Sequence, residues 1–127
     1  MDCSITALRP KERVCQDAEQ IAAICREMGA PAAEQAIGRA LGELTLILSG
    51  LAARVQAQDV ADLGRQLRRL QRMSEHLGMV SLGHVACDAR RCAETGDGTA
   101  FAAVWARLIR VAEQSLAGDR PPLDQRV

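Results

Sequence analysis

Apolar residues recur along most of the chain at intervals of three and four residues, the spacing that places side chains on one face of an α-helix. Glycine and proline interrupt this pattern at a few points, and such residues mark the ends of helices. The pattern predicts five helices, over residues 10–28, 31–56, 59–77, 79–95 and 98–117.

The predicted boundaries follow from individual residues. Pro10 suits the first position of a helix, and Asp59 is of the type that caps a helix start. Gly29 and Gly78 end the first and third helices, and the run Thr95-Gly96-Asp97-Gly98 predicts a tight turn before the last one.

The apolar stripe of each helix predicts which side chains face the core. The inward residues expected for the five helices in turn are Val14, Ala18, Ile21, Cys25 and Met28; Ile37, Leu41, Leu44, Leu48, Leu51 and Val55; Val60, Leu63, Leu67, Leu70, Ser74 and Leu77; Leu82, Val85, Ala86, Ala89 and Cys92; and Phe101, Trp105, Leu108, Ile109, Ala112 and Leu116. In the second helix, Gly38 and Gly42 stand four residues apart, which predicts close approach of another helix there.

Four long amphipathic helices with short connections favour an all-α fold, an antiparallel up-and-down four-helix bundle. The first, shorter helix is then an additional element across one end or side. Abundant alanine and scarce aromatic residues also favour helix over strand. We expect a single domain over residues 1–118 with a bundle core over 31–117, followed by a mobile tail at 119–127.

Composition narrows the function classes. The 16 basic residues balance the 16 acidic ones, so the chain has no overall charge that would favour nucleic acid or an anionic membrane. The absence of an 18-residue apolar stretch and of an export pattern predicts a cytoplasmic protein that does not insert into a membrane. The five cysteines include no Cys-x-x-Cys pair, so we expect reduced thiols, no metal and no cofactor. No phosphate-binding loop or nucleophile elbow is present.

The two histidines, His76 and His84, are eight residues apart across a predicted helix break. Only Asp88, four residues after His84, stands at the spacing of a helical metal site. We interpret this pair as a surface hydrogen bond or ion pair.

Basic residues concentrate in the third predicted helix, at Arg65, Arg68, Arg69 and Arg72. Arg65, Arg68, Arg72 and Glu75 share one face of that helix. This face is either solvated or a binding surface. Nucleic acid is disfavoured as its ligand, because no aromatic residue accompanies the arginines.

The order of segments from Pro31 to Ala117 resembles the histidine-containing phosphotransfer (HPt) domain of bacterial phosphorelays. The family motif has its histidine followed by leucine at two residues, lysine at three, glycine at four and a Leu-Gly pair ending at ten. Leu77-Gly78 sets the register here, which places Leu70 at the leucine. The same register places Arg68 at the histidine, Gln71 at the lysine and Arg72 at the glycine. Gly96-Asp97 is similar to the turn before the family's last helix.

The resemblance implies a phosphorelay protein. A guanidinium has only donors and stays protonated, so Arg68 cannot accept a phosphoryl group. The expected function is that of a non-phosphorylatable module that binds a response-regulator receiver domain or a sensor histidine kinase. The expected partner-binding residues are Arg65, Arg68, Gln71, Arg72 and Glu75.

Two alternatives remain open. One is a genuine histidine phosphotransferase that relays phosphate through His76 or His84. The other is a helical adaptor unrelated to phosphorelays, because four-helix bundles serve many functions.

Overall fold

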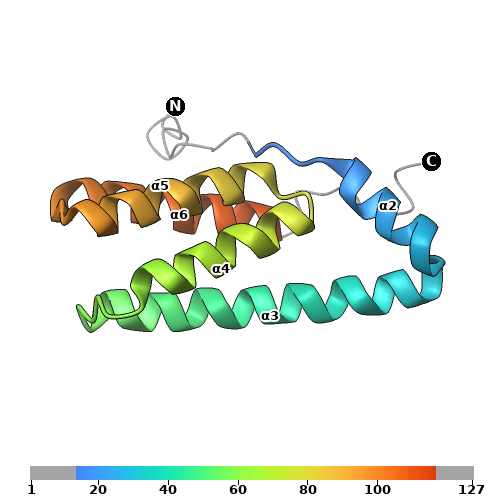
Figure 1. The fold of residues 1–127 in the computed structure, drawn as a ribbon, viewed down its shortest axis with the longest axis horizontal. Helices are drawn as coiled ribbons and strands as arrows, with labels where there is room; N and C mark the ends of the chain where they lie inside the picture. Colours follow the sequence, from blue (N-terminus) through green and yellow to red (C-terminus); the bar gives the residue numbers. More distant parts are fainter. Residues whose placement is uncertain (1–13, 117–127) are drawn as a thin grey trace, which may run out of the picture.

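The computed structural model describes residues 14–116, in which there are five α-helices and no strand. The helices are α2 (Ala18–Met28), α3 (Ala30–Gln56), α4 (Leu63–His76), α5 (Val80–Thr95) and α6 (Gly98–Leu116) (Figure 1). The all-α prediction is confirmed. The predicted helix start at Pro10 and the predicted tail over residues 119–127 lie outside the described residues.

Helices α3 to α6 run back and forth along one long axis, and α2 lies against the first half of α3 at one end (Figure 1). The pairs in close backbone contact are α4 with α5, α5 with α6, α3 with α4, and α2 with α3. The short connections explain this order, because helices joined by a few residues become neighbours.

The core lies between α3, α4, α5 and α6, where the apolar stripes meet. Its buried members are Leu44, Ile47, Leu48, Leu51, Leu63, Leu67, Leu70, Leu77, Met79, Leu82, Val85, Ala86, Ala89, Leu108, Val111 and Ala112. Leu70 is fully buried, as its position predicts. Trp105 is only half-buried and stacks on Phe101, with ring centroids 6.2 Å apart. Trp105 therefore packs at the edge of the core.

The first helix begins later than predicted, at Ala18, because residues 14–17 form an extended strap. The strap binds the turn between α4 and α5: Asp17 N donates to Gly78 O at 2.7 Å, and Ser81 N donates to Cys15 O at 3.2 Å. The Asp17 carboxylate then accepts a hydrogen bond from the amide of Glu19 and caps α2.

The stripe predicted for this first helix is only partly correct. Ile21 and Cys25 are half-buried, whereas Ala18 and Met28 are exposed. No residue of α2 is fully buried. The short helix covers α3, and its Ile21 packs against the edge of the main core.

The third predicted helix also begins later, at Leu63 rather than residue 59. Asp59 does not cap it, since its Oδ1 accepts a hydrogen bond from Ala61 N at 3.1 Å within the preceding turn. Gln58 and Asp62 both have left-handed backbone conformations, which interrupt the helical path. The inward position predicted for Val60 is therefore wrong, and 76% of this residue is exposed.

The surface of α3 differs from the prediction at two glycines. Gly38 and Gly42 are exposed, and a Cβ atom added at either would meet nothing within 4 Å. No helix within residues 14–116 packs against these glycines, so the predicted close approach of another helix is wrong for the described residues.

α3 is long and apolar enough to cross a membrane by length and composition alone.

Candidate functional site

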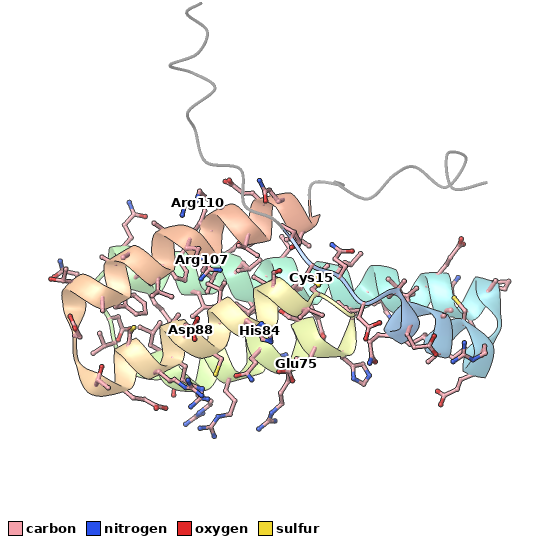
Figure 2. All side chains as sticks on the ribbon, turned by 90° about the horizontal axis from the view of Figure 1, so that it is seen from above. Cys15, Glu75, His84, Asp88, Arg107 and Arg110 are labelled. Atoms are coloured by element: carbon pink, nitrogen blue, oxygen red, sulfur yellow. The ribbon has the colours of Figure 1, made fainter. Side chains whose placement is uncertain are left out.

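The arginine face, defined here as Arg65, Arg68, Arg69 and Arg72, lies on the outer side of α4. All four side chains are exposed, opposite the buried residues Leu63, Leu67, Leu70 and Ser74. The helical repeat produces this separation, because arginines occupy the positions between the apolar ones. Figure 2 shows nitrogen-tipped side chains gathered along the edge formed by α4 and α5.

Only one of the four arginines of this face forms an ion pair within residues 14–116. Arg65 Nη2 lies 3.3 Å from Asp62 Oδ1, an exposed pair one turn apart. Arg68, Arg69 and Arg72 have no ion pair or hydrogen bond with any residue that the structure describes. Three guanidinium groups on two turns of helix therefore keep their donors free for an external acceptor.

Gln71 and Glu75 lie on the side of α4 that meets α5. Gln71 Nε2 donates to Glu75 Oε2 at 3.0 Å. Gly83 of α5 sits against them, since an added Cβ would lie 3.2 Å from Glu75 Cγ and 3.7 Å from Gln71 O. This close approach brings the outer side of α5 beside the arginine face, so the candidate surface spans two helices.

Helix α5 contributes two further arginines, Arg90 and Arg91, that lie outside the predicted cluster. Arg91 is exposed and has no partner in residues 14–116. Arg90 is 81% buried at its side chain, with Nη1 3.2 Å from Glu94 Oε2 and Nη2 donating to Cys87 Sγ at 3.7 Å. In the sequence, only the adjacency of Arg90 and Arg91 could have indicated them. Two arginines are a weaker indication of a binding surface than the four of α4.

Both predicted histidines are exposed, and His76 lies one helical turn after Arg72, at the end of the arginine face. His76 is the last residue of α4, and His84 lies in the second turn of α5. The predicted hydrogen bond or ion pair between His84 and Asp88 does not form in the structure. In residues 14–116, no three His, Cys, Asp or Glu side chains come together in a group that could hold a metal ion.

The exposed guanidinium groups of the arginine face are chemically suited to hydrogen-bond an anion. Arg68 stands at the position that the HPt resemblance assigns to the phosphoacceptor, and its guanidinium has no lone pair to attack phosphorus. A guanidinium instead donates two parallel hydrogen bonds to a carboxylate or phosphate. Arg68, Arg69 and Arg72 of α4 and Arg91 of α5 have no acidic partner within residues 14–116, and they give these two helices a local positive charge on a chain with balanced charge.

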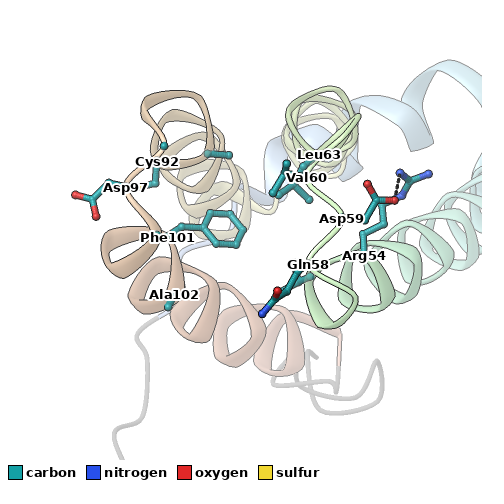
Figure 3. Close-up of a pocket in the computed structure, with 13 residues that line it drawn as sticks. Arg54, Gln58, Asp59, Val60, Leu63, Cys92, Asp97, Phe101 and Ala102 are labelled. Atoms are coloured by element: carbon teal, nitrogen blue, oxygen red, sulfur yellow. Dashed lines mark ion pairs between the residues drawn. The ribbon is translucent and has the colours of Figure 1, made fainter.

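A separate cavity of about 390 Å³ lies at the end of the molecule where α3 turns into α4 and α5 turns into α6 (Figure 3). The ring of Phe101 points into it, and Val55 and Leu63 add apolar walls. Arg54 Nη1 and Asp59 Oδ2, 3.8 Å apart, lie at its rim. The apolar pattern does not reveal this cavity, because it places Val60, which lines the cavity, in the core.

Comparison of the chain with protein-family models, with curated proteins and with solved structures found no match. The resemblance to the HPt family therefore depends on the residues quoted for it, namely Arg68, Leu70, Gln71, Arg72 and the pair Leu77-Gly78.

Proposed function

We propose that this protein is a cytoplasmic phosphorelay component with an HPt-like antiparallel four-helix bundle. It binds a receiver domain or a sensor histidine kinase through the α4 arginine face and modulates phosphotransfer without carrying phosphate itself. The observation that carries the proposal is Arg68, exposed in the middle of α4 and free of any partner in the described chain, at the motif position of the histidine.

The surroundings of Arg68 support binding of an acidic partner. Arg69 and Arg72 add unpaired positive charge beside it, and Arg91 adds more from α5. Receiver domains, the partners that the resemblance implies, present an acidic phosphorylation pocket. A protruding guanidinium can enter such a pocket and hydrogen-bond its carboxylates, and complementary charge also speeds association.

The test is a binding titration of purified receiver domains and kinase domains with charge-reversal variants. Arg68→Glu and Arg72→Glu should each weaken binding by about 2 kcal/mol or more, roughly thirtyfold in Kd, because reversal removes hydrogen bonds and adds repulsion. Binding should also weaken with added salt, which screens charges beyond about 10 Å at 0.1 M.

The matched control is Arg39→Glu, which reverses an exposed arginine on α3 that has no partner within residues 14–116. Arg110 of α6 would be a less suitable control, because it already interacts with another residue and its reversal would also disturb that interaction. Equal loss of binding from Arg39→Glu and Arg68→Glu, or no loss from either α4 variant, would contradict the proposal.

One observation favours the transferase alternative: His76 and His84 are both exposed and accessible to a partner. Incubation with a phosphorylated receiver separates the two functions. A transferase acquires an acid-labile phosphate that His76→Ala or His84→Ala removes, whereas the module proposed here acquires none.

A further inference from the structure

The cavity of about 390 Å³ at one end of the molecule lies between two turns that hydrogen bonds hold in place. In the turn from α3 to α4, Arg54 Nη1 donates to Ala61 O at 3.2 Å, and Arg54 O accepts from Asp59 N at 2.9 Å. In the turn from α5 to α6, Asp97 Oδ1 accepts from Ala100 N at 3.0 Å. The cavity is therefore already formed without a ligand, which lowers the entropic cost of binding one.

The walls of the cavity are mostly apolar and include an aromatic ring. Phe101 of α6 points into the cavity, and Val60 and Leu63 face it from the α3–α4 side (Figure 3). Val60 is 76% exposed, so most of its apolar surface is in contact with water. A ligand seated between Val60 and Phe101 would remove this surface from water, and burial of apolar surface is the main favourable contribution to binding in such sites.

The charged groups around the cavity are paired or directed away from it. Arg54 and Asp59 pair with each other at the rim, and the Asp97 carboxylate points away from Phe101 (Figure 3). The side-chain amide of Gln58 also lines the cavity and has no hydrogen-bond partner within residues 14–116. The described lining therefore offers a ligand a polar but uncharged group, and such a lining favours an uncharged ligand.

The volume and the aromatic wall indicate the size and kind of ligand. An apolar cavity of about 150 Å³ holds one benzene ring, so a cavity of about 390 Å³ has room for roughly two fused rings with a substituent. Aromatic rings attract one another beyond the effect of buried area, through stacked or edge-to-face contacts. The ring of Phe101 therefore favours an aromatic ligand over an aliphatic one of the same size.

We propose that this cavity binds a small uncharged aromatic molecule of about two fused rings. Its rings lie between Phe101 and Val60, and a hydroxyl or carbonyl group on it hydrogen-bonds the Gln58 amide. The arginine face contributes no residue to the lining, so this proposal does not depend on the proposed signalling function.

The experiment is isothermal titration calorimetry of the full chain with 2-naphthol at neutral pH, together with alkylation of the cysteines by iodoacetamide and peptide mass analysis. 2-Naphthol should bind with a Kd below about 1 mM. Cys92 lines the cavity, so saturating 2-naphthol should slow its alkylation at least about threefold. Cys15, exposed on the strap, is the internal control and should react at an unchanged rate.

Two variants test the position of the ligand. Phe101→Ala should raise the Kd for 2-naphthol at least about tenfold, because it removes the aromatic partner. Val60→Asp should raise it at least about fivefold by placing a charge against an apolar ring, and the exposure of Val60 means that the fold should tolerate the change. The matched control is Leu46→Asp, the same kind of change at a residue that is 72% exposed on α3 and outside the lining. It should bind 2-naphthol as the wild-type chain does.

The charge of the ligand is tested with 2-naphthoate and 2-naphthylmethylamine, an anion and a cation at neutral pH. Both should bind at least about tenfold more weakly than 2-naphthol, because their charge would have to leave water. Equal or higher affinity for either one would overturn the assignment of an uncharged ligand. No binding of 2-naphthol up to about 1 mM would overturn the site itself. So would binding that Leu46→Asp weakens as much as Val60→Asp does, or that protects Cys15 and Cys92 equally.

Discussion

The backbone of Asp17 lies directly against Gly78: Asp17 N donates to Gly78 O at 2.7 Å, and a Cβ at residue 78 would lie 2.2 Å from Asp17 O. Gly78 also has a φ of +76°, which only glycine adopts without strain. Gly78 thus has two structural roles. It adopts the left-handed conformation of the turn after α4, and it allows the strap at residues 14–17 to pack against that turn.

We expect Gly78→Ala to destabilise the protein by about 2–4 kcal/mol, because it adds a backbone clash to the cost of the left-handed conformation. Gly96→Ala is a close control, since Gly96 has the same φ of +76° but open space around it. Its cost should be only about 1 kcal/mol. Chemical denaturation measures both, and equal costs would show that the strap does not press on the turn.

A second prediction concerns the depth of the core. Leu70 is fully buried on α4, so Leu70→Ala should cost about 2–5 kcal/mol through lost burial and a new cavity. Trp105 is half-buried, and Trp105→Ala should cost less than its size suggests, about 1–3 kcal/mol, because part of its ring already meets water. Thermal and denaturant unfolding of the two variants gives the comparison. A larger loss at Trp105 than at Leu70 would contradict this order.

Helix periodicity predicts most of this fold because it records which side chains avoid water. Leu67, Leu70 and Ser74 are buried where the stripe of α4 places them. The apolar pattern does not report backbone conformation. Both helix starts that were predicted too early, those of α2 and α4, are set by the backbone conformation of the preceding residues. The left-handed Gln58 and Asp62 are ordinary residues whose torsion angles no apolar pattern reveals.

For the candidate site, too, the sequence predicts what lies on one helix but not what depends on the packing of two helices. The sequence identifies Arg68 and Arg72 as members of one face, because spacing along a single helix determines it. Helix α5, which carries the exposed Arg91, packs against α4 at Gly83, and this tertiary contact does not follow from the spacing of residues along one helix. Similarly, the open space at Gly42 follows from the absence of a covering helix among the described residues, whereas the sequence shows only the glycine.

Glycines within helices provide a third prediction. Gly38→Ala should stabilise the protein by about 0.5–1 kcal/mol, since alanine favours helix and the added Cβ meets nothing within 4 Å. Gly83→Leu should destabilise it by about 1–3 kcal/mol, because a larger side chain would separate α5 from Glu75 and Gln71 of α4. Denaturant midpoints measure both, and stabilisation by Gly83→Leu would mean that α4 and α5 are less closely packed than described.

The last prediction tests the motif register on which the proposed function rests. The wild-type chain, incubated with a sensor kinase, its receiver and ATP, should acquire no acid-labile phosphate. The triple variant Arg68→His, Gln71→Lys, Arg72→Gly should acquire it, because residue 68 is exposed in the middle of α4 and an imidazole there has the lone pair that a guanidinium lacks. The glycine at residue 72 costs about 1 kcal/mol of helix stability, which the fold must tolerate.

The control for this gain of function is Arg69→His combined with the same changes at residues 71 and 72. It places a histidine on the same exposed surface but out of register, so it should remain unlabelled. Equal labelling of the two triple variants would show that any exposed histidine on α4 suffices, and the register would lose its support. Label on the wild-type chain that His76→Ala or His84→Ala abolishes would instead establish the transferase alternative, since the phosphate would then travel through a histidine outside the motif position.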